Sequence, residues 1–580
     1  MKKVLLMMIF ILSFTSIISA QTHNSVSLNE TELYKLLEIA EIRGLIHRLP
    51  SARPYSRSLI VSALEELDGN SRSLSSGEKD VLDDYIERFA EDKDKPFLQD
   101  GDLRIENDLF PLKAGAYIDS EVRVDLGNPG DWGMQNFLGL YAQGDMGRYV
   151  SYAMDLNIQI NQVVLQDGAA YPYAWEPYSY TKTWDGGSRY LSSAENFAQM
   201  PQELAFGWAI LPEIAFSFWN NKLDMRFGRV RHDWGLGEGN LFLDKQARPF
   251  VGIEGTTSPW KWLNFSFLFG GLEYGETFRN DSEFGIKSTA GTQQNMYSIL
   301  QLEIAPTKWL YFSLFDAGVF LKRPELGYML PLMPQLFHQN NVGDFDNLMF
   351  GGTLALSWPD LFRTYFTLYL DEFKPSAGLN ATRNQVAFQT GIKAPIPGSP
   401  WSMVTFQYSK IEPFTYTHYY VNDSPWYDGL KMETGYQSNG ENLGSNLEPN
   451  SDEFLLSFQI QPARGWSTTA GYRLIRHGKP GSVVGSTYDP WNVNDSDGAY
   501  HPDNQTKDFL KDGIYEWFHI ISLGGKLDLR DWDFPAQIGF SYSFVYEYDT
   551  DYQINGNYNA LNGSTTFRHL VGITFKIWPY

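Results

Sequence analysis

Hydrophobic and polar residues follow two different rhythms along this chain, and the rhythm changes near residue 100. Between residues 30 and 91 apolar residues recur every three or four positions, which is typical of amphipathic helices. Gly44 is a candidate end for the first helix and Ser56 a candidate N-cap for the second. Ser75 and Glu78 form a capping box for a third. The sequence therefore predicts a small N-terminal helical bundle.

Beyond about residue 100 the period becomes two, and it stays so to the C-terminus. Apolar and polar residues alternate in many segments, among them 121–125, 152–161, 264–269, 366–371, 456–461 and 537–548. A water-soluble β-sandwich has such strands too. Segments of about ten residues with aromatic-rich apolar faces instead favour tilted strands that cross a membrane.

The length of the alternating region predicts the size of the barrel. At about 26 residues per strand with its loop, residues 101–580 make roughly 18 strands. The predicted fold class is mainly β, a large transmembrane antiparallel β-barrel preceded by the helical bundle. Charged residues on the polar faces, such as Glu121, Arg123, Asp155 and Asp371, are then expected to face a polar lumen.

The first residues resemble a secretory signal peptide. Lys2 and Lys3 precede an apolar run over residues 4–18, and Ser19 and Ala20 form a small-residue cleavage site. The alternative is a membrane anchor, but the run is shorter than the ~20 residues that span a bilayer. We expect a signal peptide over 1–20, a periplasmic helical bundle over 21–100 and a barrel over 101–580 in the cell outer membrane.

Composition narrows the classes of partner. The chain has no cysteine, so disulfides and thiolate metal sites are excluded. A net charge of −23 disfavours nucleic acid. Aromatic residues make up 16% of the chain, as expected of strands with one apolar face. We expect contact with outer-membrane lipids, and a monomer.

The C-terminal strand carries a pattern of its own. Gly572, Phe575, Ile577 and Tyr580 resemble the closing-strand signal that the barrel assembly machinery reads. That machinery is therefore an expected partner during biogenesis.

No motif for catalysis or cofactor binding is present. The chain lacks a His-Glu-x-x-His motif, a nucleophile elbow and a phosphate loop. Gly235, Gly237 and Gly239 are followed by Asn240, where a dinucleotide fingerprint needs glycine. We predict a protein that is not an enzyme, with no cofactor, metal or catalytic residue. An active site assembled across strands is the alternative that sequence leaves open.

Long polar segments at 166–199, 279–294, 421–451 and 477–512 interrupt the strands and predict extracellular loops. The first is the richest in aromatic residues, including Tyr173, Trp175, Tyr178 and Trp184. Exposed rings of this kind stack on sugars, and rings that pack a loop against the barrel are the alternative.

The segment 226–249 breaks the expected alternation of a membrane strand. If the strand continued past Phe227, Arg229 and Arg231 would face lipid. Either Gly228 forms a β-bulge, or the strand leaves the hydrocarbon near Arg229. Both alternatives place Arg229, Arg231 and Trp234 near a rim or the lumen, followed by a glycine-rich turn.

This segment resembles the capsule assembly Wzi family. The resemblance rests on several short motifs in the same order: Gly228-Arg229, Trp234-Gly235-Leu236-Gly237, Ala247-Arg248-Pro249, Gly343-Asp344-Phe345-Asp346-Asn347, Leu370-Asp371-Glu372-Phe373, Glu412-Pro413-Phe414-Thr415-Tyr416 and, in the helical region, Arg53-Pro54-Tyr55-Ser56-Arg57. It implies an outer-membrane barrel with a periplasmic bundle that acts as a lectin-like anchor for capsular polysaccharide or exopolysaccharide.

Two functions from different classes follow. The first is attachment and assembly of a surface polysaccharide, and the second is a porin for small solutes, with helices that contact peptidoglycan. The candidate polysaccharide-binding residues are Arg229, Arg231, Trp234, Arg248 and Asp346, together with the rings Tyr173, Trp175, Tyr178 and Trp184. Only the family resemblance favours the first function over the second.

Overall fold

The computed structural model describes most of the chain. The described residues are 23–89, 103–105, 111–147, 149–164, 205–219, 222–272, 295–321, 325–330, 333–342, 346–371, 373, 375–378, 380–381, 384–418, 434–438, 441–445, 447–478, 507, 509–511, 513–532, 534–552, 558–560 and 565–577. The rings Tyr173, Trp175, Tyr178 and Trp184 and the expected signal peptide lie outside them.

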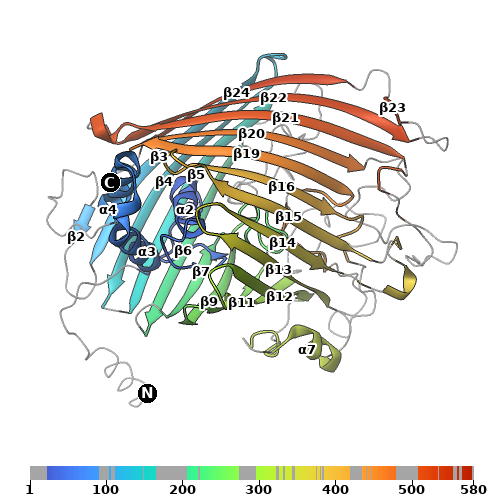
Figure 1. Ribbon diagram of the computed structural model, residues 1–580, viewed down its shortest axis with the longest axis horizontal. Helices are drawn as coiled ribbons and strands as arrows, with labels where there is room; N and C mark the ends of the chain where they lie inside the picture. The colour runs from blue at the N-terminus through green and yellow to red at the C-terminus, as the bar shows by residue number, and fades with distance from the viewer. Residues whose placement is uncertain are drawn as a thin grey trace.

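An antiparallel barrel of 18 strands encloses the molecule's interior (Figure 1). Its strands are β3 (Leu112–Asp125), β4 (Trp132–Met146), β5 (Val150–Val164), β6 (Ala205–Phe218), β7 (Leu223–Val230), β9 (Phe250–Trp260), β10 (Leu263–Gly271), β11 (Asn295–Ile304), β12 (Leu310–Leu321), β13 (Asn347–Trp358), β14 (Phe362–Leu370), β15 (Val386–Pro395), β16 (Met403–Ile411), β19 (Ser451–Ala463), β20 (Trp466–Gly478), β21 (Ile514–Asp528), β22 (Ala536–Tyr552) and β24 (Thr566–Ile577). Two short strands, β2 (Leu103–Ile105) and β23 (Tyr558–Ala560), pair with β3 and β22. Pairing of β24 with β3 closes the barrel, which confirms the predicted fold class.

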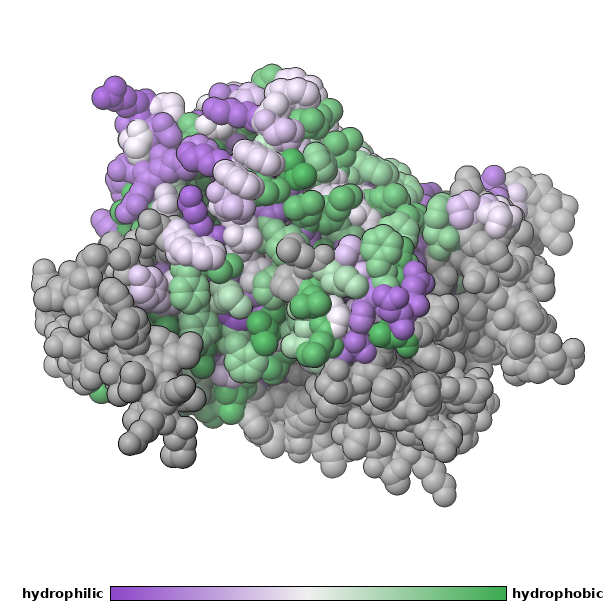
Figure 2. All heavy atoms as spheres, turned by 90° about the horizontal axis from the view of Figure 1, so that it is seen from below, coloured by the Kyte–Doolittle hydropathy of each residue, from purple (hydrophilic) through white to green (hydrophobic). Residues whose placement is uncertain are grey.

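The outer face of the barrel is apolar. Alternate residues on neighbouring strands, such as Leu314, Phe350 and Leu354, are about half exposed. Figure 2 shows one such face, on which hydrophobic residues gather over a broad area. Tryptophans stand exposed at strand ends and turns, at positions 260, 262, 309, 358, 466 and 532, and form the aromatic girdle of an outer-membrane barrel. The protein is therefore located in the outer membrane.

The two ends of the barrel differ in their connections. At one end β9 and β10, β13 and β14, and β19 and β20 are joined by two or three residues. We call this the short-turn end. The opposite, long-loop end carries the connections from β5 to β6, β7 to β9, β12 to β13 and β16 to β19. Bacterial outer-membrane barrels have short turns on the periplasmic side and long loops outside.

The three predicted helices are present, with their predicted caps. They are α2 (Thr31–Ile42), α3 (Arg57–Gly69) and α4 (Ser76–Phe89), with a 3-10 turn η1 (Ser71–Ser73) between the last two. Gly44 follows α2 with a φ of 74°, a conformation that glycine adopts readily. Ser56 Oγ accepts from the Leu59 N–H at the start of α3, and Ser75 and Glu78 bond reciprocally at α4. Among the described residues, no helix is both long and apolar enough to cross a membrane.

The helical bundle docks on the short-turn end of the barrel. Trp401 and Met403, beside the turn between β15 and β16, belong to the same buried cluster as the helices. The Trp401 indole N–H donates to the Glu78 carbonyl at 2.9 Å, and the Tyr85 hydroxyl donates to Gln461 at 3.1 Å. The bundle and the barrel wall therefore share one core.

Candidate functional site: the lumen loop and its contacts

The connection from β7 to β9 turns into the barrel. We call residues 231–249 the lumen loop. Its strand β8 (Asp233–Trp234) pairs with β1 (Ala52–Arg53), which leads from α2 to α3, so a loop from one end meets a segment from the other. Trp234 is 1% exposed, and its backbone N–H donates to the Leu243 carbonyl at 2.9 Å. The loop is therefore a folded part of the barrel interior.

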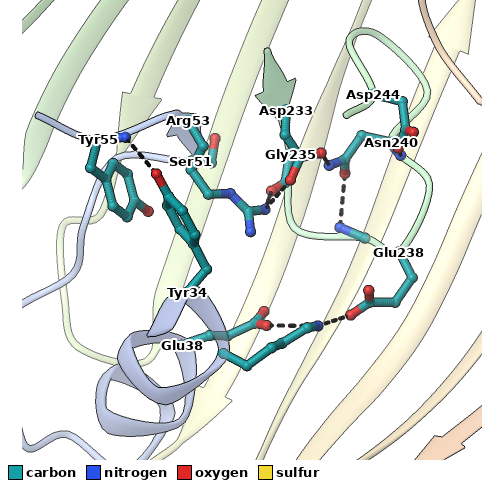
Figure 3. A network of polar contacts seen from close by, with 12 residues as sticks. Tyr34, Glu38, Ser51, Arg53, Tyr55, Asp233, Gly235, Glu238, Asn240 and Asp244 are labelled. Atoms are coloured by element: carbon teal, nitrogen blue, oxygen red, sulfur yellow. Dashed lines mark hydrogen bonds and ion pairs between the residues drawn. The ribbon is translucent and has the colours of Figure 1, made fainter. Parts of the chain in front are cut away.

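Asn240 holds the glycine-rich turn of the lumen loop in place (Figure 3). Its side chain accepts from the Gly237 N–H at 3.0 Å and donates to Asp233 at 2.6 Å. Gly237 lies against the wall, because an added Cβ would come within 1.7 Å of the Gln389 side chain. Asn240, which stands where a dinucleotide-binding motif would need glycine, thus stabilises this turn.

Acidic and basic side chains join the bundle, the lumen loop and the wall. Lys35 of α2 pairs with Glu238 of the lumen loop, Glu38 pairs with Lys393 of β15 at 2.7 Å, and Lys393 also lies 3.1 Å from Glu238. In Figure 3, Glu38 extends from α2 and Glu238 from the lumen loop, and the two carboxylates point toward one another. Burial acts to raise the pKa of both carboxyls, but the two lysines outweigh it, bringing the pKa of Glu38 down to about 2 and that of Glu238 well below its usual range.

The register of two neighbouring strands supplies the wall's share of these contacts. Arg363 of β14 lies directly opposite Lys393 of β15, and both point inward and are almost fully buried. Their partners Glu41 and Glu38 are three residues apart on one face of α2. Two basic side chains on neighbouring strands of the wall thus pair with two acidic side chains on one face of α2.

A second carboxylate group lies deeper in the lumen loop. Asp233 pairs with Arg53 at 3.3 Å. Asp244 is 1% exposed and accepts from the backbone N–H groups of Asn240 at 2.7 Å and Gln246 at 2.8 Å. Burial, together with the neighbouring Asp233 carboxylate, raises the pKa of Asp244 to about 7. This aspartate is therefore partly protonated near neutral pH.

Aromatic residues fill the lumen around the tip of the loop. Phe242 stacks on Phe315 of β12 with ring centres 4.2 Å apart, and Tyr369 lies 4.9 Å away. Tyr436 donates its hydroxyl to the Phe242 carbonyl at 2.7 Å, and Tyr416 donates to the Leu241 carbonyl at 2.9 Å. These rings belong to one buried cluster that spans the inner wall, the lumen loop and the connection between β16 and β19.

Part of the connection between β16 and β19 also enters the lumen. It contains the short strands β17 (Gln437–Ser438) and β18 (Glu441–Asn442). The Asp244 N–H donates to the Leu443 carbonyl at 2.9 Å, and the Tyr416 N–H donates to Asp371 at 2.9 Å. The sequence analysis placed residues 421–451 in an outer loop, so for this part, where it is described, the structure corrects that prediction.

The structure separates the predicted site residues that it describes. Trp234 and Arg248 are buried with the lumen loop, and Arg229 and Arg231 are half-buried where β7 enters it. Asp346 lies elsewhere, at the start of β13, where its carboxylate accepts from the Tyr328 hydroxyl at 2.7 Å. Of the two alternatives for this segment, the β-bulge at Gly228 is wrong, because β7 pairs with β6 and β9 without a shift in register. The chain departs from the wall after Val230 instead.

Sequence reasoning missed the residues that hold the interior together, namely Lys35, Glu38, Glu238, Lys393, Tyr416 and Tyr436. One signal was available. Lys393 and Arg363 fall on the inward face of alternating strands, and an inward charge requires a partner. Within the described residues, no group of three or more histidine, aspartate or glutamate side chains is placed to hold a metal ion.

Comparison with known proteins was made for the whole chain. No protein-family model matches it, and no curated protein matches it. Among solved structures, Wzi, an outer membrane protein involved in group 1 capsule assembly in Escherichia coli and described as a carbohydrate-binding β-barrel, superposes with a TM-score of 0.53. The match has 14% identity and covers 97% of this chain and 100% of Wzi.

The chain has the fold of Wzi. The sequence resemblance is confirmed at that level, over nearly the whole length. Pseudomonas aeruginosa OprD gives a TM-score of 0.37 at 10% identity, covering 80% of this chain and 95% of OprD. Acinetobacter baumannii OccAB2 gives 0.40 at 9% identity, covering 80% and 98%. Of the three, only Wzi has a TM-score high enough to support a shared fold.

Proposed function

We propose that this protein binds a surface polysaccharide at the long-loop end of its barrel and keeps that polymer attached to the cell, without catalysing a reaction. Assembly of a capsule or exopolysaccharide is the process that such attachment serves. The helical bundle then faces the periplasm, after removal of a signal peptide over residues 1–20, because short turns lie on that side of bacterial barrels.

The filled lumen carries this proposal. A porin passes solutes through a water-filled lumen with a polar interior. Here Trp234, Phe242 and Tyr436 are each 1% exposed or less and belong to one core that joins opposite parts of the wall. An interior packed in this way favours a surface-binding protein over a channel. The shared fold with a carbohydrate-binding β-barrel supports the class of ligand.

The long-loop end offers chemistry suited to sugars. Tyr173, Trp175, Tyr178 and Trp184 fall within twelve residues of the sequence between β5 and β6, and aromatic faces carry the negative quadrupole that attracts the C–H groups of a sugar ring. Arg229 lies near the end of β7 at this end of the barrel, and Arg231 begins the lumen loop there. The buried Trp234, Arg248 and Asp346 act in this proposal by holding the loops in position.

The decisive experiment measures polymer retention in the natural host. The gene is deleted and complemented with wild type, with a variant carrying alanine at the four rings, or with Trp260→Ala/Trp262→Ala at the short-turn end as a matched control. Cell-bound and released surface polysaccharide are then quantified. We expect the deletion and the four-ring variant to shift polymer into the medium, and the control to retain it as wild type does.

A conductance measurement tests the porin alternative directly. Purified wild type in planar bilayers is expected to be silent, whereas deletion of residues 235–248 from the lumen loop is expected to open steps of conductance. Two results together would favour the porin over polysaccharide attachment. The wild-type protein would conduct steadily, and deletion of the gene would leave polymer retention unchanged.

A further inference from the structure

Part of the connection between β12 and β13, residues 325–330 and 333–342, lies on the outside of the barrel. We call these residues the outer flap; it includes α7 (Gln335–Val342). Gln335 donates its backbone N–H to the Asp316 carboxylate at 2.6 Å and its side-chain N–H to Ser298 Oγ at 2.9 Å. In Figure 1, α7 lies beside the barrel next to β12 and β13.

Register shows that these contacts are on the lipid-facing side of the wall. Asp316 of β12 is paired with Phe350 of β13, which is 45% exposed, and lies two residues from Leu314, which is 57% exposed. The neighbouring residues Phe315 and Ala317 point inward and are buried in the lumen core. The outer flap therefore covers a carboxylate that the strand presents to the membrane, where an uncovered charge is costly.

The flap is tied down by its polar residues. The Ser298 hydroxyl donates to the Tyr328 carbonyl at 2.8 Å, and the Gln339 side chain donates to the Asp346 carbonyl at 2.7 Å. His338 Nε2 lies 2.8 Å from Glu325 and packs edge-on against Tyr328, with ring centres 4.7 Å apart. This close packing requires glycine at 327, because a Cβ there would lie 2.0 Å from the His338 ring.

The apolar residues of the flap face away from the protein. On α7 the buried residues are Gln335, His338 and Gln339, whereas Leu336 is 51% and Phe337 62% exposed. Further exposed apolar side chains in the preceding turn are Leu326, Met329 and Leu330. A helix on a water-soluble surface shows the opposite arrangement, with its apolar side inward. This inversion fits a helix whose outer surroundings are hydrocarbon.

The depth of the flap fits the same surroundings. β11 has ten residues, about the 9–11 residues that a tilted strand needs to cross the hydrocarbon. Ser298 is its fourth residue, roughly 10 Å along the strand from the long-loop end at about 3.4 Å per residue. The first turn of α7 is hydrogen-bonded at that level. Asn340 and Asn341, one turn further on, are exposed and return the chain toward β13.

We propose that the outer flap is inserted in the membrane, with Leu336, Phe337 and the preceding turn in contact with the acyl chains of the outer leaflet. The apolar side of the flap continues the lipid-facing band of β12 and β13. It thereby widens the barrel's contact with lipid on one side, at the end where the long loops emerge.

Site-specific labelling of the full-length protein tests this placement. The chain has no cysteine, so Phe337→Cys gives one labelling site for a fluorophore. Leu314→Cys on the outer wall is the lipid reference, and Asp68→Cys on the exposed side of α3 is the water reference. Each labelled barrel is reconstituted in phosphatidylcholine vesicles, with folding checked by heat-modifiable migration, and is quenched by nitroxide lipids or by iodide.

We expect nitroxide lipids to quench the label at 337 about as strongly as at 314, and at least about twofold more than at 68, as for a helix buried in the interface. Quenching by iodide to the level seen at 68 would overturn the proposal, and so would shielding from both quenchers, which would point to a second copy of the chain against the flap. A label at Met329→Cys is expected to lose lipid quenching when Phe337→Asp is added and to keep it with Asn341→Asp.

Discussion

The lumen loop and the outer flap both leave the long-loop end of the barrel, yet they fold in opposite directions and present opposite chemistry to the wall. The lumen loop brings Trp234 and Phe242 into an aromatic core and pairs Glu238 with two lysines. The flap turns Gln335 and His338 toward the protein and leaves Leu336 and Phe337 outside. The lumen loop therefore meets the wall through both stacked rings and ion pairs, whereas α7 meets it through polar side chains and turns its apolar residues away.

Truncation of Trp234 in the lumen loop is expected to have the largest effect on stability, because this ring lies in the packed interior of the barrel. Trp234→Ala removes a fully buried indole, and we expect a loss of about 3–5 kcal/mol in the free energy of unfolding. Trp219→Ala is the matched control, since Trp219 is 72% exposed at a short turn. Urea unfolding in detergent, followed by tryptophan fluorescence and heat-modifiable migration, measures both. Equal effects of the two substitutions would contradict the packed interior described above.

The protonation of Asp244 gives the lumen loop a pH dependence. Its pKa is raised from 3.8 to about 7 in the folded protein, so the folded state binds a proton more tightly than the unfolded state does. The contribution is fully present below pH 4 and is lost as the pH rises toward 7, amounting to a few kcal/mol by linkage. Asp244→Asn should therefore gain stability relative to wild type between pH 4 and 7.

Unfolding of wild type and Asp244→Asn across that range checks this sign. Asp68→Asn, on the exposed side of α3, is the control, and it should run parallel to wild type. Parallel curves for Asp244→Asn would mean that its carboxyl ionises normally inside the barrel.

A methyl group at position 327 is expected to have the smallest effect of the three and to act only on the outer flap. Gly327→Ala places a Cβ 2.0 Å from the His338 ring, and overpacking of this kind costs about 1–3 kcal/mol. Gly69→Ala, with no atom within 4 Å of the new Cβ, is the control. Limited proteolysis near α7 should quicken in Gly327→Ala alone, while global unfolding changes little. A large drop in global stability would show that the flap supports the whole barrel.

The parts of this fold that sequence predicts are those governed by local rules. The caps at Ser56 and Ser75 and the glycine after α2 depend on a few neighbouring residues. The strands follow from alternation, and the strand count follows from length. The inward turn of the lumen loop follows from neither, because it depends on Lys35 meeting Glu238 across 203 positions of sequence.

The candidate site was predicted only in part for the same reason. Trp234, Arg248 and Asp346 were selected by motif position, and the structure shows each of them buried among residues that no local pattern connects. α7 was not predicted, since its first turn buries Gln335 and His338 and exposes Leu336. The rule that the apolar face of a helix is buried holds for helices in water, and for α7 it would predict the wrong face to be buried.

The pairing of β1 with β8 constrains the order in which the molecule is built. β1 belongs to the helical bundle, which sits at one mouth of the barrel, and β8 belongs to a loop that descends from the other. Once β24 has joined β3, the two partners can reach each other only through opposite openings. Other bonds bridge even longer stretches of chain, such as Arg530 to Asp84 across 446 residues. If the bundle and the lumen loop meet before the seam between β24 and β3 closes, that obstacle does not arise, and closure of the barrel then encloses an interior that is already packed.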